Sequence, residues 1–176
     1  ENSTDTLSVV DLTTGAILPT VAVGTNPRGI AASPAGDKVY VANVTSSDVS
    51  IFDVSTSTVT TISAGASPVG AYVNPQGTLA YISNAGGTTI SIISTATNSV
   101  VQTVDIGATP NFLGGSFVTN KGDNVVAYVP LVTLDSVRVM SLPSIVGKTV
   151  TLATDTGSIN VATNVSLGDS GGLTIT

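Results

Sequence analysis

Few residues in this sequence are of the types that carry enzyme chemistry. The 176-residue chain contains no histidine and no cysteine, which excludes imidazole-based acid–base catalysis, thiol nucleophiles, disulfides and the usual zinc sites. Asp11 and Asp53 could form a carboxylate pair, because they occupy one position of a repeat described below. A carboxylate where a strand enters a turn most often accepts hydrogen bonds from the next amides, so we interpret both as turn residues.

Two further patterns could carry chemistry but are weak. Gly168-Asp169-Ser170-Gly171-Gly172 matches the run around the nucleophile of chymotrypsin-like proteases. Ser170 has no histidine to take its proton, so we interpret the run as a turn and predict that the protein is not an enzyme and needs no cofactor. Calcium is possible, although no dense acidic loop is present. Its candidate oxygen ligands are Asp48, Asp105, Asp123 and Asp155.

Three sequons predict candidate glycosylation sites at Asn2, Asn43 and Asn164. Asn43 also ends a predicted strand, and we favour that structural role for it. The tyrosines could suggest a carbohydrate-binding platform of aromatic rings. Three of them, at positions 40, 81 and 128, share one position of a predicted buried strand, and core packing is therefore the favoured interpretation.

Composition and charge indicate a neutral, β-rich protein. Only 9% of the residues are charged, the net charge is −6, and 41% are hydrophobic. Five scattered cations cannot match a nucleic-acid backbone, so nucleic acid is not an expected partner. The apolar residues are interleaved with Ser and Thr, and no run is long enough for a membrane-spanning helix. Valine, threonine and glycine dominate over helix formers, which favours β structure. So neutral a surface predicts glycans or burial against other copies.

An internal repeat sets the predicted architecture. The segment 26–43 recurs as 67–84, and the offset from Pro27 to Pro68 is 41 positions. A third, looser copy starts near Thr109. Each unit holds four candidate strands of about six residues with turn signals between them, which is the length of a propeller blade. In the unit starting at Asn26 the predicted strands are 28–33, 38–43, 48–54 and 59–64, here called A to D.

The second strand of each unit resembles the YVTN family of β-propeller repeats. The residues that carry this resemblance are Tyr40-Val41-Ala42-Asn43, Tyr81-Ile82-Ser83-Asn84 and the preceding segment 23–29. The resemblance covers residues 5–115, weakens to residue 152 and is absent beyond. It implies an extracellular or cell-surface location, because such repeats are common in surface-layer proteins. YVTN propellers carry about seven blades, and this chain has fewer units.

The fold class predicted is all-β, a propeller-like array of about four four-stranded antiparallel blades. Residues 1–152 form the repeat region, with a partial blade at 1–24 and blades at about 25–65, 66–107 and 108–152. Residues 153–176 supply C-terminal strands, with Ser158–Val165 and Gly171–Thr176 as the candidates. These strands complete the partial blade within one chain or pair with a neighbouring subunit. A fragment of a larger propeller is the third possibility.

We therefore expect a secreted structural protein, a surface-layer or filament subunit that forms homo-oligomers or polymers by exchanging β-strands. The candidate strand-exchange residues are Thr4, Leu7, Val9, Asp11, Leu173 and Ile175. The alternative is a soluble binding propeller for a protein or carbohydrate ligand. It would present the turns at 25–28, 66–69 and 108–111.

Overall fold

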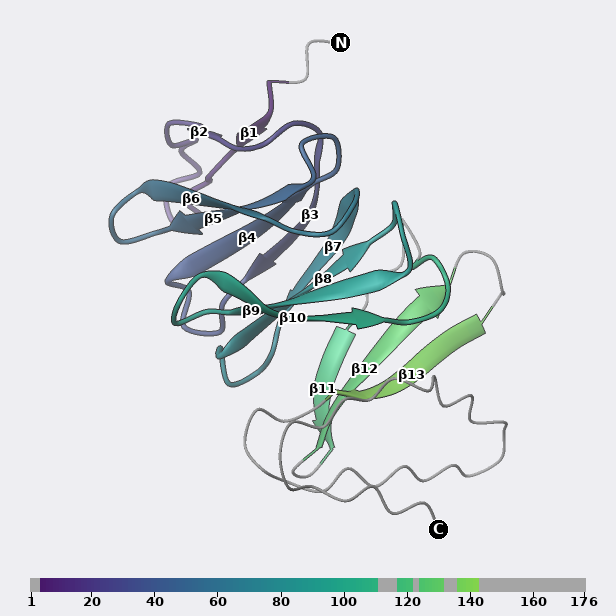
Figure 1. Ribbon diagram of the computed structural model, residues 1–176. Helices are drawn as coiled ribbons and strands as arrows, with labels where there is room; N and C mark the ends of the chain where they lie inside the picture. Colours follow the sequence, from purple (N-terminus) through teal and green to yellow (C-terminus); the bar gives the residue numbers. More distant parts are fainter. Residues whose placement is uncertain (1–3, 111–116, 122–123, 132–135, 143–176) are drawn as a thin grey trace.

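The computed structural model describes residues 4–110, 117–121, 124–131 and 136–142, and within them the fold is all-β (Figure 1). The first complete sheet has the strand order β3-β4-β5-β6, and the second has the order β7-β8-β9-β10. A third sheet contains β11, β12 and β13. A short pair, β1 and β2, precedes the first complete sheet along the chain. The prediction of antiparallel four-stranded sheets is confirmed for two units.

The strand bounds repeat from sheet to sheet. The short pair is β1 (Thr6–Leu7) and β2 (Val21–Ala22). The first sheet comprises β3 (Pro27–Ala32), β4 (Lys38–Asn43), β5 (Asp48–Asp53) and β6 (Thr58–Ser63). The second comprises β7 (Pro68–Val73), β8 (Leu79–Asn84), β9 (Thr89–Ser94) and β10 (Ser99–Asp105). The third comprises β11 (Phe117–Lys121), β12 (Asn124–Leu131) and β13 (Ser136–Leu142). In the first sheet the predicted bounds lie within one residue of these.

Local chemistry explains why the strands begin and turn where they do. Gly36 and Gly77 have φ of 73° and 69° in the first hairpin of each sheet, a conformation that glycine adopts without steric cost. Pro27 and Pro68 begin the first strands, where a missing N–H is tolerated. In both sheets the register shifts just after this proline. Turn residues therefore repeat with the same spacing as the strands.

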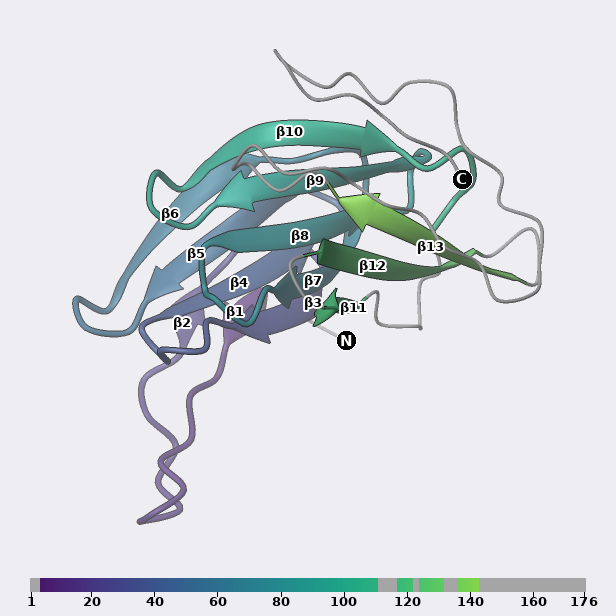
Figure 2. The same cartoon turned by 90° about the horizontal axis from the view of Figure 1, so that it is seen from below.

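The sheets stack face to face, with β3 and β7 side by side (Figures 1 and 2). Their backbones approach closely at Gly29, where an added Cβ would lie 2.5 Å from the carbonyl oxygen of Val69 and 2.8 Å from Cα of Gly70. Only glycine fits between two backbones this close. A side chain also joins the two sheets. Lys38 Nζ, at the start of β4, donates to the carbonyl of Thr95, just after the end of β9, at 2.6 Å.

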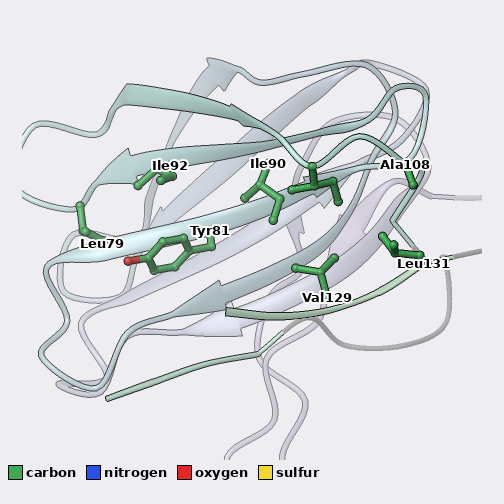
Figure 3. Packing of buried hydrophobic residues seen from close by; sticks show 8 residues of the cluster. Leu79, Tyr81, Ile90, Ile92, Ala108, Val129 and Leu131 are labelled. Carbon is green, nitrogen blue, oxygen red and sulfur yellow. The ribbon is translucent and has the colours of Figure 1, made fainter. Parts of the chain in front are cut away.

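Two apolar clusters fill the spaces between successive sheets. The cluster between the first and second sheets contains Tyr40, Ala42, Val49, Ile51, Val73, Ala80, Ile82 and Ile93. The cluster between the second and third sheets contains Leu79, Tyr81, Ile90, Ile92, Ile106, Ala108, Val129 and Leu131 (Figure 3). The expectation that Tyr40 and Tyr81 belong to the core is confirmed, whereas the side chain of Tyr128 lies outside the described residues.

Burial falls from the middle strands to the outer ones, as expected for stacked sheets. Every residue of β8 is buried, whereas β6 contains only exposed and half-buried residues. The described residues form a curved stack and no closed ring (Figure 2). The described part of the chain also contains no helix that is long and apolar enough to cross a membrane.

Candidate functional site

The carboxylates considered as calcium ligands serve different hydrogen-bond networks. Asp48 Oδ1 accepts a hydrogen bond from Asn43 Nδ2 at 2.7 Å. Asp105 Oδ1 accepts from Thr88 Oγ1 at 2.7 Å and from the Gly107 N–H at 2.8 Å. No group of three potential metal ligands occurs within the part of the chain that the structure describes. Asp123 and Asp155 lie outside that part, and so does Ser170.

Asp11 and Asp53 close turns, as the sequence predicts. Asp53 Oδ1 accepts from the N–H groups of Ser55 and Thr56, both at 3.0 Å. Asp11 accepts from the Thr13 N–H at 2.8 Å and, through its other oxygen, from the hydroxyl of the next threonine. These hydrogen bonds favour the charged form and hold the pKa of both carboxyls below the ordinary value. Both carboxylates are therefore structural.

A buried asparagine at the end of the second strand organises one end of each complete sheet. Asn43 is fully buried, and its amide donates to Asp48 Oδ1 at 2.7 Å and to Ser50 Oγ at 2.9 Å. The Gly24 N–H donates to the same Ser50 Oγ at 3.1 Å. The network thus fixes the linker that enters the sheet. The sequence predicts a turn asparagine here but does not reveal its two acceptors.

The second sheet repeats this network, and the third replaces it. Asn84 donates to Thr89 Oγ1 at 3.1 Å and to Ser91 Oγ at 3.0 Å. Pro110 pairs with Leu131 as Pro68 pairs with Asn84, so Leu131 holds the asparagine position in the third sheet. It packs in the same cluster as Ile106 and Ala108. An apolar anchor there takes the place of a hydrogen-bonded one.

The sequons have unequal access to solvent. A glycan on Asn43 would replace the amide hydrogen bonds that bury this side chain, so its amide is not accessible in the folded chain. The burial of Asn43 supports the structural role that the sequence favours for it. Asn2 and Asn164 lie outside the described residues, so glycosylation there stays a prediction.

The predicted strand-exchange residues of the N-terminal segment lie in a two-stranded unit, here called the half-sheet (residues 4–23). It projects from the stack as a long hairpin (Figure 2). Leu7 lies in β1 opposite Val21, and Val9 is half-buried. Thr4 is exposed, and Asp11 begins the turn at the hairpin tip. The structure therefore brings these four residues onto one unit, whereas Leu173 and Ile175 lie outside the described residues.

The half-sheet corresponds to the third and fourth strands of a complete sheet. Thr6 and Leu7 pair with Ala22 and Val21 just as Asp48 and Val49 pair with Ser63 and Ile62. Among the described residues, no strand pairs with β1 except β2. Within the described part of the chain, one edge of β1 therefore has no partner strand.

Positions that the preceding sheet covers elsewhere are exposed here, since Ile93 belongs to the cluster between the first and second sheets and Ala71 packs against it. Val10 is 48% exposed, whereas Phe52 and Ile93 at the same repeat position are 6% and 0% exposed. Ile30 on β3 is 58% exposed, whereas Ala71, 41 positions later, is half-buried. Arg28 and Ala32 share this face of β3 and are also exposed. We call this surface (Arg28, Ile30 and Ala32) the open face, which sequence analysis did not single out.

The comparisons with known proteins bear on the fold. No protein-family model matches the sequence, and no curated protein matches it. Hydrazine synthase of Kuenenia stuttgartiensis is similar, with a TM-score of 0.66 and 26% identity over 78% of this chain and 40% of that chain. A functionally unknown protein from Desulfotomaculum acetoxidans is similar with a TM-score of 0.63 and 15% identity, over 81% of this chain and 50% of that one.

A third solved structure is similar over a comparable length. The dihydro-heme d1 dehydrogenase NirN in complex with DHE gives a TM-score of 0.62 and 19% identity, over 84% of this chain and 32% of that chain. The present chain thus spans at most half the length of these three solved structures. These comparisons and the stacked sheets identify the chain as an all-β protein with a β-propeller-like fold.

Proposed function

We propose that this protein is a non-enzymatic structural subunit that assembles outside the cell, in a surface layer or filament, by pairing β-strands between copies. The observation that carries the proposal is the half-sheet beside the open face. Val10 and Ile30 are exposed there, although the complete sheets cover the same repeat positions. Covering about 100 Å² of apolar surface contributes about 2.5 kcal/mol, which adds to the backbone hydrogen bonds that further strands would form with β1.

The outer sheet edge also supports association between copies. The edge strand β6 (Thr58–Ser63) contains no charged residue and pairs with β5 without a bulge. Soluble proteins commonly protect such edges with lysine, proline or bulges. The low charge of the whole chain also favours association, because weak electrostatic repulsion allows copies to approach one another. An extracellular location is supported by the resemblance to YVTN repeats.

A second candidate function is a soluble binding module. It is favoured by the linkers that enter the first two complete sheets, because Asn26 and Ser67 both adopt positive φ, at 59° and 47°. Equivalent turns are thereby presented at the same end of successive sheets. In that case the protein would stay monomeric at high concentration and bind a protein or carbohydrate ligand through these turns.

A pair of matched variants tests the assembly function. Ile30→Asp places a charge on the open face and is expected to raise the concentration needed for assembly at least about tenfold, because a carboxylate there would be desolvated. Val54→Asp adds the same charge at a side chain that is 46% exposed in the β5–β6 turn, and it is expected to leave assembly unchanged. Equal assembly of both variants, measured by light scattering, would contradict a role for the open face.

A further inference from the structure

In the half-sheet, two hydroxyl side chains stand where the complete sheets place the acceptors of a buried asparagine, and among the described residues Thr6 Oγ1 is hydrogen-bonded to Thr4 Oγ1 at 3.1 Å. In the complete sheets the buried asparagine donates to the first and third residues of the neighbouring strand segment, Asp48 and Ser50 in the first sheet. Thr6 and Ser8 occupy these positions in the half-sheet, since β1 pairs with β2 in the register of β5 with β6. Ser8 is exposed. The half-sheet therefore has the acceptors for an asparagine amide on its unpaired side.

A segment near the C-terminus carries the matching asparagine at the matching distance from a turn. In the complete sheets the turn glycine precedes the buried asparagine by seven positions, from Gly36 to Asn43 and from Gly77 to Asn84. Gly157 precedes Asn164 by the same seven positions. The resemblance continues beyond the asparagine, because Asn43-Val44-Thr45 corresponds to Asn164-Val165-Ser166.

The residues before the turn also correspond. Ser33 and Asn74 stand three positions before the turn glycines, and each side chain accepts a hydrogen bond from a backbone N–H across the hairpin. Thr154 stands three positions before Gly157 and has an oxygen that can do the same. Residues 149–164 thus carry the pattern of the first two strands of the repeat, the two that the half-sheet lacks.

We infer that residues 149–164 of a second copy dock as a β-hairpin between the half-sheet and the open face. This inference rests on the proposed function and names its donor segment. By the register of β4 with β5, Asn164 lies opposite Thr6 and Ala162 opposite Ser8. In this arrangement Asn164 is buried as Asn43 is, so the inference replaces the predicted glycan at Asn164. The first strand of this hairpin, residues 149–154, covers Ile30.

A second copy is the occupant because of where the described chain ends. The half-sheet lies at one end of the stack and β13 (Ser136–Leu142) at the other, in both views (Figures 1 and 2). The donor hairpin follows β13 in the chain. Donation from one copy to the next is therefore a heterologous, head-to-tail contact, which repeats without closing and yields a filament.

Engineered disulfides test the register, and the chain offers a clean background because it contains no cysteine. Copies carrying Ser8→Cys are mixed with copies carrying Ala162→Cys under oxidising conditions. The inference predicts a covalent dimer on a non-reducing gel. The matched control replaces Ala162→Cys by Val161→Cys, whose side chain points to the opposite face of the strand, and should yield at least about tenfold less dimer.

The outcomes separate this inference from the proposed function. A disulfide that forms within single copies of the double variant Ser8→Cys/Ala162→Cys, and not between copies, would overturn donation by a second copy. Native protein that assembles while neither mixture crosslinks would overturn the donor segment and leave the proposed function standing. A native protein that stays monomeric and does not crosslink would overturn both.

A second pair of variants tests whether the side-chain amide of Asn164 contributes to docking. Asn164→Asp removes the N–H donor and places a carboxylate beside two oxygens, so the concentration for half-assembly should rise about tenfold. Asn98→Asp makes the same charge change in the β9–β10 turn, where the side-chain oxygen accepts from Lys38 Nζ at 2.9 Å and can still do so. Equal assembly of the two variants would show that the amide plays no part.

Discussion

At the scale of single residues, the buried tyrosines give the structure a distinctive alkaline response. Burial is the main cause that raises the pKa of both Tyr40 and Tyr81 to about 12. Between pH 10 and 12 the unfolded chain therefore loses protons that the folded chain retains. The free energy of unfolding is expected to be unaffected below about pH 10 and to fall as the pH rises towards 12.

This prediction is checked by urea unfolding across that pH range, together with the ultraviolet absorbance of phenolate. The double variant Tyr40→Phe/Tyr81→Phe should lose much of the fall. Titration of all tyrosines near pH 10 in the folded protein would contradict the burial of these two phenols.

The hydroxyl of Tyr40 is buried and has no hydrogen-bond partner among the described residues. Tyr40→Phe removes this unpaired group while keeping the ring in the cluster between the first and second sheets. We expect the free energy of unfolding to rise by about 1 kcal/mol at neutral pH. Calorimetry measures this change, and a clear loss of stability would indicate that the hydroxyl is hydrogen-bonded in solution.

At the scale of elements, the close approach of β3 and β7 sets the spacing of the first two complete sheets. Gly29→Ala would place a methyl group against the backbone of β7 and should cost about 1–3 kcal/mol of unfolding free energy, because the sheets must move apart. Gly87→Ala is the matched control, since a Cβ there meets nothing within 4 Å. Similar thermal midpoints for the two variants would contradict this packing.

The strands and turns could be predicted from the sequence, whereas some of the contacts between them could not. Strand positions and turn glycines could be predicted because each repeat copies them at a fixed spacing. The double acceptor of Asn43 could not, because it depends on the register of β4 against β5, which places Asn43 opposite Asp48. The open face was missed for a related reason: the alternation of β3 does not show that Ile30 lacks a covering strand.

At the scale of the whole molecule, a stack of sheets has two end faces. Each is buried by further parts of the chain, by closure into a ring or by contact with another molecule. The described sheets form a propeller-like stack in which the half-sheet leaves one end incomplete. The chain spans at most half the length of the three similar solved structures described above. We propose that strands of a second copy complete the half-sheet at that end. Sheets would then continue from one subunit to the next.

Sedimentation velocity of the native protein over a wide concentration range tests this account most directly. Head-to-tail donation predicts species of increasing mass as the concentration rises, and filaments in negative-stain images of the same samples. The Ile30→Asp variant should shift the series to higher concentration. A single sedimenting species with the 17.4 kDa mass of one chain, unchanged at the highest concentration, would contradict the account.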